Sequence, residues 1–218
     1  MDEDTTRQVG ALLGGPFGES RRPLLVCDVD EVVLHLVAPF EQVLIERGYE
    51  LRTRSFKLTG NIFHCETGAE ATQADVWQAL AQLFEEQAQR QALVDGAAEA
   101  LNGLVRDVDV VFLTNLPHQF GAIRRDYLIS HGLDMPLLTN TGSKAPAIER
   151  LKARRPAVGF VDDTPINLTQ VGEAHEDVAL FHFMADETFR AMAGPLDNVH
   201  LSSGDWVETA DHMRRVLL

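Results

Sequence analysis

The chain has 218 residues, of which 45% are hydrophobic and 24% are charged, and its formal net charge is -14. This length suffices for one packed domain with a smaller inserted module, and the composition is that of an ordinary globular protein. No run of residues approaches the roughly 18 to 20 uninterrupted apolar positions of a membrane-spanning helix, so the sequence argues against a membrane protein.

The negative charge also argues against nucleic acid as a partner. A strongly acidic surface repels the phosphate backbone unless a local basic stripe offsets it. The best basic cluster is short, and two arginine pairs are isolated, so we interpret all of these side chains as solvated. They are Arg52, Arg54 and Lys57 in the cluster, and Arg124, Arg125, Arg154 and Arg155 in the pairs.

The cysteines and the N-terminus bear on location. Cys27 and Cys65 form neither a Cys-x-x-Cys motif nor a disulfide framework. Residues 1–4 are acidic and lack the apolar core of a secretory signal. A reducing cytoplasm is the expected location.

The predicted strands appear along the chain as short apolar runs. Residues 1–21 precede them and are expected to be a loose lead-in, because Gly-Gly-Pro-Phe-Gly at 14–18 cannot sustain a helix or a strand. The runs that follow are typical of buried parallel strands. They cover residues 24–27, 108–113, 157–161 and 178–183, with a weaker run at 136–139.

Helical patterns lie between these strands. We expect helices over residues 97–105, 120–131, 145–154 and 206–217. Gly132 is the expected stop of the second, and Ser143 the expected N-cap of the third. Strands that alternate with helices predict an α/β fold built on a doubly wound parallel sheet.

One segment does not fit this alternation. Residues 37–94, between the first two strands, are far more than a crossover connection needs. Within them we expect helices at 40–47 and 74–91, and a loop or short extended chain at 58–65. We interpret residues 37–94 as a small, mainly helical cap, and residues 1–36 and 95–218 as the core.

Polar side chains follow three of the predicted strands. They are Asp28 and Asp30, then Thr114 and Asn115, then Asp162 and Asp163. Ligands of open parallel sheets bind beyond the carboxyl ends of the strands, so these side chains are expected to meet there. Four carboxylates in one crevice are costly without a cation, and oxygen ligands favour a hard ion, above all Mg²⁺ when phosphate is present.

Residues of these types are suited to phosphoryl transfer. A metal-neutralised carboxylate can attack phosphorus and form an aspartyl-phosphate. A second carboxylate two residues further on can protonate the leaving oxygen and later activate water. A lysine can offset charge on the phosphate oxygens, and Lys144 is the candidate because it begins an expected helix whose N-terminus also favours an anion.

Four motifs in order resemble those of the haloacid dehalogenase superfamily of phosphatases and phosphotransferases. Each motif alone is weak, and the ordered set carries the resemblance. It implies a Rossmann-like core, and the family's cap often lies between its first two motifs, where this chain has its insertion. The motifs are Asp-Val-Asp-Glu-Val at 28–32, Phe-Leu-Thr-Asn at 112–115, Lys144, and Gly-Phe-Val-Asp-Asp at 159–163.

The resemblance implies a role for each matching residue. Asp28 would be the nucleophile and a metal ligand, and Asp30 the general acid and base, which would also offer its backbone carbonyl to the metal. Thr114 would hydrogen-bond the phosphoryl group and Lys144 would stabilise it. The pair Asp162 and Asp163 would complete the magnesium site.

Three further residues are marked by their position. Asn115, beside Thr114, is a candidate for contact with substrate. Asn167 can orient an acidic ligand, although a local turn contact explains it equally well. Many family members have glycine directly after the second aspartate, whereas this chain has Glu31, which adds negative charge near the site.

The leading hypothesis is a Mg²⁺-dependent phosphatase acting on a small phosphorylated metabolite through an aspartyl-phosphate. A phosphomutase or other phosphotransferase of the superfamily would use the same residues. A dehalogenase would use Asp28 against carbon and needs no second acidic residue, so Asp30 argues against it. A non-catalytic binding domain is disfavoured because every expected catalytic residue type is present. The substrate and the oligomeric state are left open.

Overall fold

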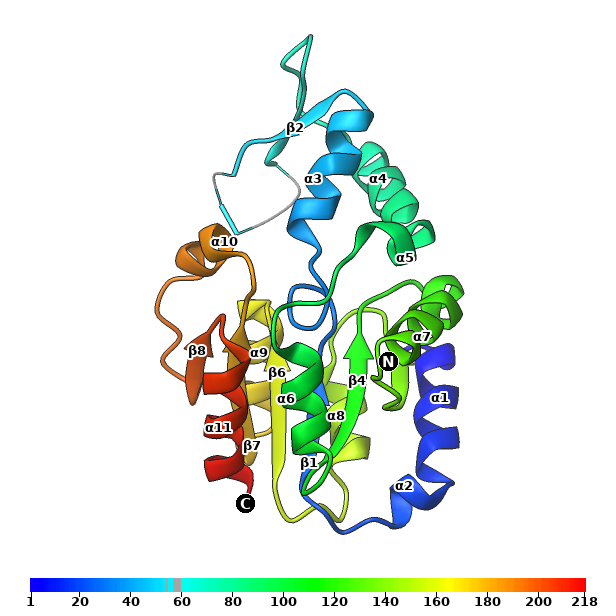
Figure 1. The fold of residues 1–218 in the computed structure, drawn as a ribbon, viewed down its shortest axis with the longest axis vertical. Helices are drawn as coiled ribbons and strands as arrows, with labels where there is room; N and C mark the ends of the chain where they lie inside the picture. Colours follow the sequence, from blue (N-terminus) through cyan, green and yellow to red (C-terminus); the bar gives the residue numbers. More distant parts are fainter. Residues whose placement is uncertain (54, 57–59) are drawn as a thin grey trace.

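The protein is described by a computed structural model that covers residues 1–53, 55–56 and 60–218. Arg54 and Lys57 of the basic cluster, and the first two residues of the segment expected at 58–65, lie outside the described residues. A six-stranded sheet forms the lower part of the molecule, and smaller elements lie beyond the carboxyl ends of its strands (Figure 1).

The sheet is parallel throughout, with the strand order β5-β4-β1-β6-β7-β8. Its strands are β1 (Leu24–Cys27), β4 (Asp109–Thr114), β5 (Leu137–Thr139), β6 (Val158–Asp162), β7 (Val178–Phe183) and β8 (Leu201–Ser203). Five of them were predicted from their apolar runs. The short strand β8 was not, because a single apolar residue, Leu201, begins it.

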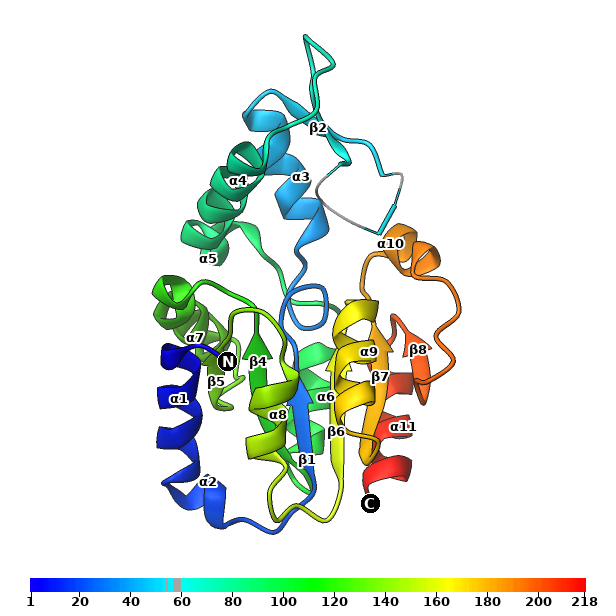
Figure 2. The ribbon, with the colours of Figure 1, turned by 180° about the vertical axis from the view of Figure 1, so that it is seen from behind.

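Helices cover both faces of the sheet (Figures 1 and 2), which confirms the doubly wound arrangement. One face carries α6 (Ala97–Leu104) and α11 (Trp206–Leu217), and the other carries α8 (Ala145–Leu151) and α9 (Pro165–Ala174). Two buried apolar clusters, one on each face, hold these layers together. At the edge of the sheet, α7 (Gly121–Ser130) follows the short 3₁₀ helix η1 (His118–Phe120) and contacts β5.

The expectation of a loose lead-in at residues 1–21 is wrong. The segment forms α1 (Glu3–Leu13) and α2 (Pro16–Glu19). The Asp2 carboxylate caps α1 by accepting a hydrogen bond from the Thr5 amide at 2.8 Å, and Val9 is fully buried against the sheet cluster. Proline is tolerated at the first helical position, so Pro16 starts α2 rather than preventing it.

Two other helix ends also differ from the expectation. The helix expected at 145–154 ends at Leu151, and its N-cap is Lys144 rather than Ser143, with no side-chain cap. The Ser143 hydroxyl is 3.4 Å from the Ala145 amide, too long for a strong cap.

The segment between β1 and β4 has its own apolar cluster, with Phe40, Leu44 and Leu83 at its centre. It contains α3 (Val37–Glu46), β2 (Tyr49–Leu51), β3 (Ile62–His64), α4 (Gln73–Glu85) and α5 (Gln87–Arg90). The helix expected at 74–91 is thus interrupted at Glu86. Residues Leu116 and Phe120, which follow β4, join the same cluster and connect this segment to the sheet.

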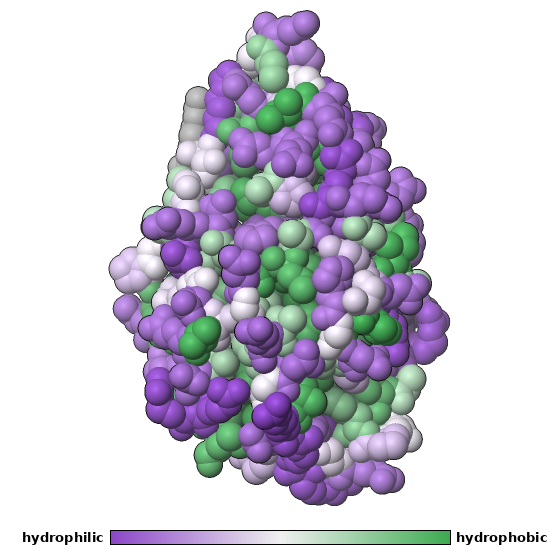
Figure 3. Space-filling model, viewed as in Figure 1, coloured by the Kyte–Doolittle hydropathy of each residue, from purple (hydrophilic) through white to green (hydrophobic). Residues whose placement is uncertain are grey.

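The surface is mostly hydrophilic on the face shown in Figure 3, and the apolar side chains that reach it lie in separate patches. Among the described residues, no helix combines the length and the apolar character required to cross a bilayer.

Candidate active site

An ammonium group lies between two carboxylates at the carboxyl end of the sheet. Lys144 Nζ is 2.6 Å from Asp28 Oδ1 and 2.7 Å from Asp162 Oδ2. Neighbouring parallel strands bring them together, because Cys27 pairs with Val161 and the aspartates follow directly. All three side chains are buried, with Lys144 1% exposed and Asp162 fully enclosed. Burying these charges is costly, and the two ion pairs offset part of that cost.

Three carboxylates share this one ammonium group. Asp28, Asp162 and Asp163 each offer an oxygen, and these oxygens lie within 4.8 Å of one another. Burial raises the pKa of Asp28 to about 7, with Lys144 opposing the shift and Asp162 adding to it. Burial raises the pKa of Asp163 well above its usual range, and the neighbouring carboxylates of Asp162 and Asp28 add to this shift. The site therefore carries more negative charge than Lys144 neutralises, which suits a divalent cation.

The two adjacent aspartates have different surroundings. Asp162 accepts hydrogen bonds from the Thr164 amide and from Asn167 Nδ2, each at 2.9 Å, in addition to Lys144. Asn167 thus lies beside Asp162, where an orienting residue was expected. Asp163 accepts a hydrogen bond from the Thr164 hydroxyl at 3.0 Å, and is the more exposed of the two. Its carboxylate has more freedom to bind an ion.

A histidine that the motifs did not mark supports the backbone here. His182 Nε2 is 2.9 Å from the backbone oxygen of Asp163, and Nδ1 is 2.7 Å from the Ser202 hydroxyl. Burial lowers the pKa of His182, which favours the neutral ring. The strand β7 therefore fixes the position of the acidic pair.

The Thr114 hydroxyl, at the end of β4, is buried and has no hydrogen-bond partner among the described residues. Unpaired buried hydroxyls are costly, and one at a sheet edge is suited to a ligand oxygen. Asn115 is instead engaged: it donates to the Gly142 oxygen at 3.1 Å and accepts from Asn140 at 2.7 Å. It braces the loop that leads to Lys144.

Asp30 is held from two directions. Its Oδ1 atom is 3.0 Å from Arg124 Nη2 and accepts a hydrogen bond from Gln91 Nε2 at 2.9 Å. The interpretation of Arg124 as a solvated side chain is wrong, since it is fully buried. The sequence does carry a signal for this, because Arg124 stands four residues from both Phe120 and Leu128, on the apolar stripe of α7. The same interpretation fails for Arg155, which is buried against Asp109.

Glu31 has a structural role that its position after Asp30 did not reveal. Its backbone φ is 59°, a left-handed conformation that favours glycine. Its buried carboxylate accepts hydrogen bonds from the amides of Leu36 and Val37, each at 2.6 Å, and of Asp186 at 3.0 Å. Glu31 thus caps the start of α3 and ties it to the segment after β7.

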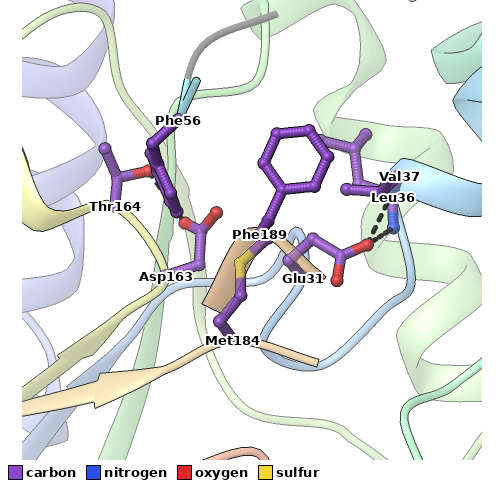
Figure 4. Close-up of a pocket in the computed structure, with 8 residues that line it drawn as sticks. All are labelled: Glu31, Leu36, Val37, Phe56, Asp163, Thr164, Met184 and Phe189. Carbon is purple, nitrogen blue, oxygen red and sulfur yellow. Dashed lines mark hydrogen bonds between the residues drawn. The ribbon is translucent and has the colours of Figure 1, made fainter. Parts of the chain in front are cut away.

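A cavity of about 250 Å³ opens beside this site (Figure 4). Asp163 and Glu31 line one part of it. The other walls are apolar and include Val37, Met184, Phe56 and Phe189. The rings of Phe56 and Phe189 meet edge to face, with centroids 6.0 Å apart. The cavity has the size for a small ligand with an apolar part.

Solved structures share this architecture. A haloacid dehalogenase-like family hydrolase from Streptococcus pneumoniae is 10% identical and aligns with a TM-score of 0.59, covering 88% of this chain and 98% of its own. A HAD family hydrolase from Deinococcus radiodurans, with bound phosphate and sodium, is 16% identical with a TM-score of 0.59, covering 91% and 97%. The chain has the haloacid dehalogenase-like fold.

A third structure of this fold is a predicted phosphoglycolate phosphatase from Haemophilus somnus. It is 14% identical with a TM-score of 0.55, covering 88% of this chain and 98% of its own. No protein-family model matches the chain, and neither does any curated protein. The haloacid dehalogenase-like fold is therefore visible in the structure at identities where sequence comparison finds no relative.

Proposed function

We propose that this protein is a Mg²⁺-dependent phosphatase that hydrolyses a small phosphorylated metabolite. The observation that carries the proposal is the contact of Lys144 with both Asp28 and Asp162, at the same end of the sheet as the Thr114 hydroxyl, which is unpaired among the described residues. A nucleophilic carboxylate, a cation and a hydroxyl donor are the groups that a transferring phosphoryl group needs. A phosphotransferase of the same fold would use the same groups.

In the first half-reaction, a carboxylate oxygen of Asp28 attacks phosphorus. A bond from Asp28 to phosphorus forms as the ester bond breaks, and Asp30 gives its proton to the departing oxygen, which leaves as an alcohol. In the second half-reaction, a water molecule attacks phosphorus and gives a proton to Asp30. The bond between phosphorus and Asp28 breaks, and inorganic phosphate leaves. Lys144 and Thr114 stay bound to the phosphoryl oxygens throughout.

A magnesium ion fits the donor set. Asp28 and Asp163 have carboxylate oxygens within reach of one another, and Asp162 and the backbone oxygen of Asp30 are further ligands by resemblance. The ion would neutralise the charge that accumulates when a phosphate enters this acidic site. Burial is the main cause of the raised pKa values of Asp28 and Asp163, and the neighbouring carboxylates add to it, so a bound cation would favour the ionised form of both.

We infer that residues 37–94 act as a cap and that the neighbouring cavity receives the remainder of the substrate. Phe56, from this segment, and Phe189, from α10 (Glu187–Met192), both line the cavity, and their rings are in contact. A cavity of about 250 Å³ favours a small leaving group with an apolar face. The predicted phosphoglycolate phosphatase of the same fold is consistent with a small phosphorylated substrate. A cytoplasmic location remains our expectation.

The test is a phosphatase screen over generic aryl phosphates and a metabolite panel, with Mg²⁺ and with chelator. We expect turnover with Mg²⁺ and none with chelator. Asp28→Asn should lower turnover by at least about 10³-fold, because it removes the nucleophile. The fold should be kept, because the asparagine side chain has the same shape. Asp126→Asn, at an exposed position of α7, is the matched control. Absence of turnover across the panel would favour a non-catalytic binding domain.

A further inference from the structure

The buried guanidinium of Arg124 joins three parts of the molecule. It extends from α7, donates hydrogen bonds to Gln87 through Nε and to Gln91 Oε1 at 3.0 Å through Nη2, and forms an ion pair with Asp30, whose Oδ1 is 3.0 Å from Nη2. Gln87 and Gln91 belong to the chain that returns from the inserted segment toward the sheet. The Arg124 side chain is 0% exposed.

Stability alone does not explain this arginine. Removing a guanidinium from water costs several kcal/mol on the scale of buried ions, and full hydrogen bonding is needed to offset it. Nη1 of Arg124 is nevertheless buried without a hydrogen-bond partner among the described residues. An apolar side chain would fill this position on the stripe of Phe120 and Leu128 at lower cost.

The contacts hold Asp30 by one oxygen. Arg124 and Gln91 both bind Oδ1, and no hydrogen bond within the described part of the chain goes to Oδ2. Gln91 is itself fixed, because its Nε2 also donates to the His35 oxygen at 3.0 Å and its backbone oxygen accepts from the Tyr127 hydroxyl. The Asp30 carboxylate is therefore oriented at Oδ1 by the hydrogen bond from Gln91 and by the ion pair with Arg124, and Oδ2 has neither contact.

We propose that Arg124 is a positioning residue that, together with Gln91, orients Asp30 so that Oδ2 exchanges the proton with the leaving oxygen. This inference rests on the proposed phosphatase function. Arg124 does not touch the substrate. It acts through Asp30, and it makes proton transfer depend on the chain segment 87–91.

The role predicts a dependence on the leaving group. A phenyl phosphate needs a proton on its departing oxygen, whereas a dinitrophenyl phosphate leaves with little help, so losing an oriented acid affects the first far more. We expect Arg124→Met to lower kcat/KM for phenyl phosphate by about 10²-fold and kcat/KM for dinitrophenyl phosphate by less than about 5-fold, because kcat/KM reports the half-reaction in which the leaving oxygen takes its proton. Asp30→Asn should give the same pattern.

The double variant Asp30→Asn with Arg124→Met tests whether the arginine acts through the aspartate. If it does, the second change costs less than about 2-fold beyond the first, because residues that act as a unit are not additive. Arg125→Met, at an exposed position next in sequence, is the matched control and should keep wild-type kinetics. Gln91→Met removes the hydrogen-bond donor to Asp30 Oδ1 and should show a weaker form of the same pattern. This variant replaces Arg124→Met in the test if the arginine variant does not fold.

The outcomes separate the two proposals. Equal losses of kcat/KM with both phosphates, additive losses in the double variant, or a higher kcat/KM without Arg124 would each overturn the positioning role while leaving the phosphatase function standing. A wild-type protein that hydrolyses neither phosphate would overturn the proposed function and this role with it.

Discussion

Lys144 Nζ lies 2.6 Å from Asp28 Oδ1, so the predicted nucleophile is paired with the predicted phosphate-binding cation before any substrate is bound. Burial opposes the charge on Lys144, but Asp162 and Asp28 outweigh it and raise the pKa of the ammonium. Lys144 therefore stays protonated over the whole working range of pH. The negative charge that remains on the three carboxylates is what a metal would offset.

The first prediction concerns metal and pH. The pKa of Asp28 rises from 3.8 to about 7 on folding, so the folded protein holds this proton at pH values where the unfolded chain has lost it. Without metal, stability should fall as pH rises from about 4 to 7, by up to about 4 kcal/mol, and remain low above that. Mg²⁺ competes with the proton, so it should raise the melting temperature more at pH 8 than at pH 5.

This is measured by thermal unfolding at several pH values, with Mg²⁺ and with chelator. Asp163→Asn is the informative variant, because it removes a candidate ligand and one of the repelling charges. Its melting temperature should respond less to Mg²⁺. An effect of Mg²⁺ that is the same at pH 5 and pH 8, or that persists unchanged in this variant, contradicts the assignment of the metal site.

The second prediction concerns Thr114. Its hydroxyl has no partner among the described residues, so Thr114→Val removes an unsatisfied polar group and should leave the melting temperature unchanged or raise it. The same change removes a hydrogen bond to a charged phosphoryl oxygen. We expect kcat/KM to fall by about 10- to 100-fold.

Thr139→Val is the matched control for this experiment. Thr139 pairs with Thr114 in the sheet register, and its hydroxyl accepts from Gln8 at 2.8 Å and bonds His118 at 2.5 Å. The control should lower stability and leave kcat/KM unchanged. The assignment of Thr114 fails if the two variants behave alike.

The third prediction concerns Glu31. Glu31→Ala leaves three backbone amides without their carboxylate acceptor, so we expect a loss of about 3 kcal/mol in the free energy of unfolding. Glu31→Gly loses the same bonds but adopts the left-handed backbone without strain, so it should be more stable than the alanine variant by about 1 kcal/mol. Urea denaturation measures both. An alanine variant within about 0.5 kcal/mol of wild type contradicts the capping role.

The fourth prediction concerns the cavity. Phe56→Ala removes an aromatic wall, and we expect KM for an aryl phosphate to rise by about 10-fold with kcat within about 2-fold. Trp77→Ala, which removes an exposed aromatic side chain from α4, is the control and should leave KM unchanged. A Phe56 variant with wild-type KM for every aryl phosphate tested would show that the leaving group binds elsewhere.

Five of the six strands of the sheet, and the acidic residues and threonine that follow them, could be predicted from the sequence. Apolar runs ending in aspartate or threonine predict parallel strands, and such strands present their carboxyl ends at one edge. For that reason the sequence alone predicts that Asp28, Thr114, Asp162 and Asp163 lie close together. This information is local, since each strand and the residue that follows it lie within a few positions of the chain.

The contacts of Arg124 and Glu31 could be found only in the folded structure, because their partners lie far away in the chain. Arg124 reaches Asp30 across 94 positions of the chain (124 minus 30), and the Glu31 carboxylate caps both α3 and the distant amide of Asp186. Charged side chains are interpreted as solvated when only the chain is known, because their burial depends on partners that folding brings from elsewhere. Short motifs therefore suffice to propose the chemistry, whereas the contacts of Asp30 with Arg124 and Gln91 exist only in the folded chain.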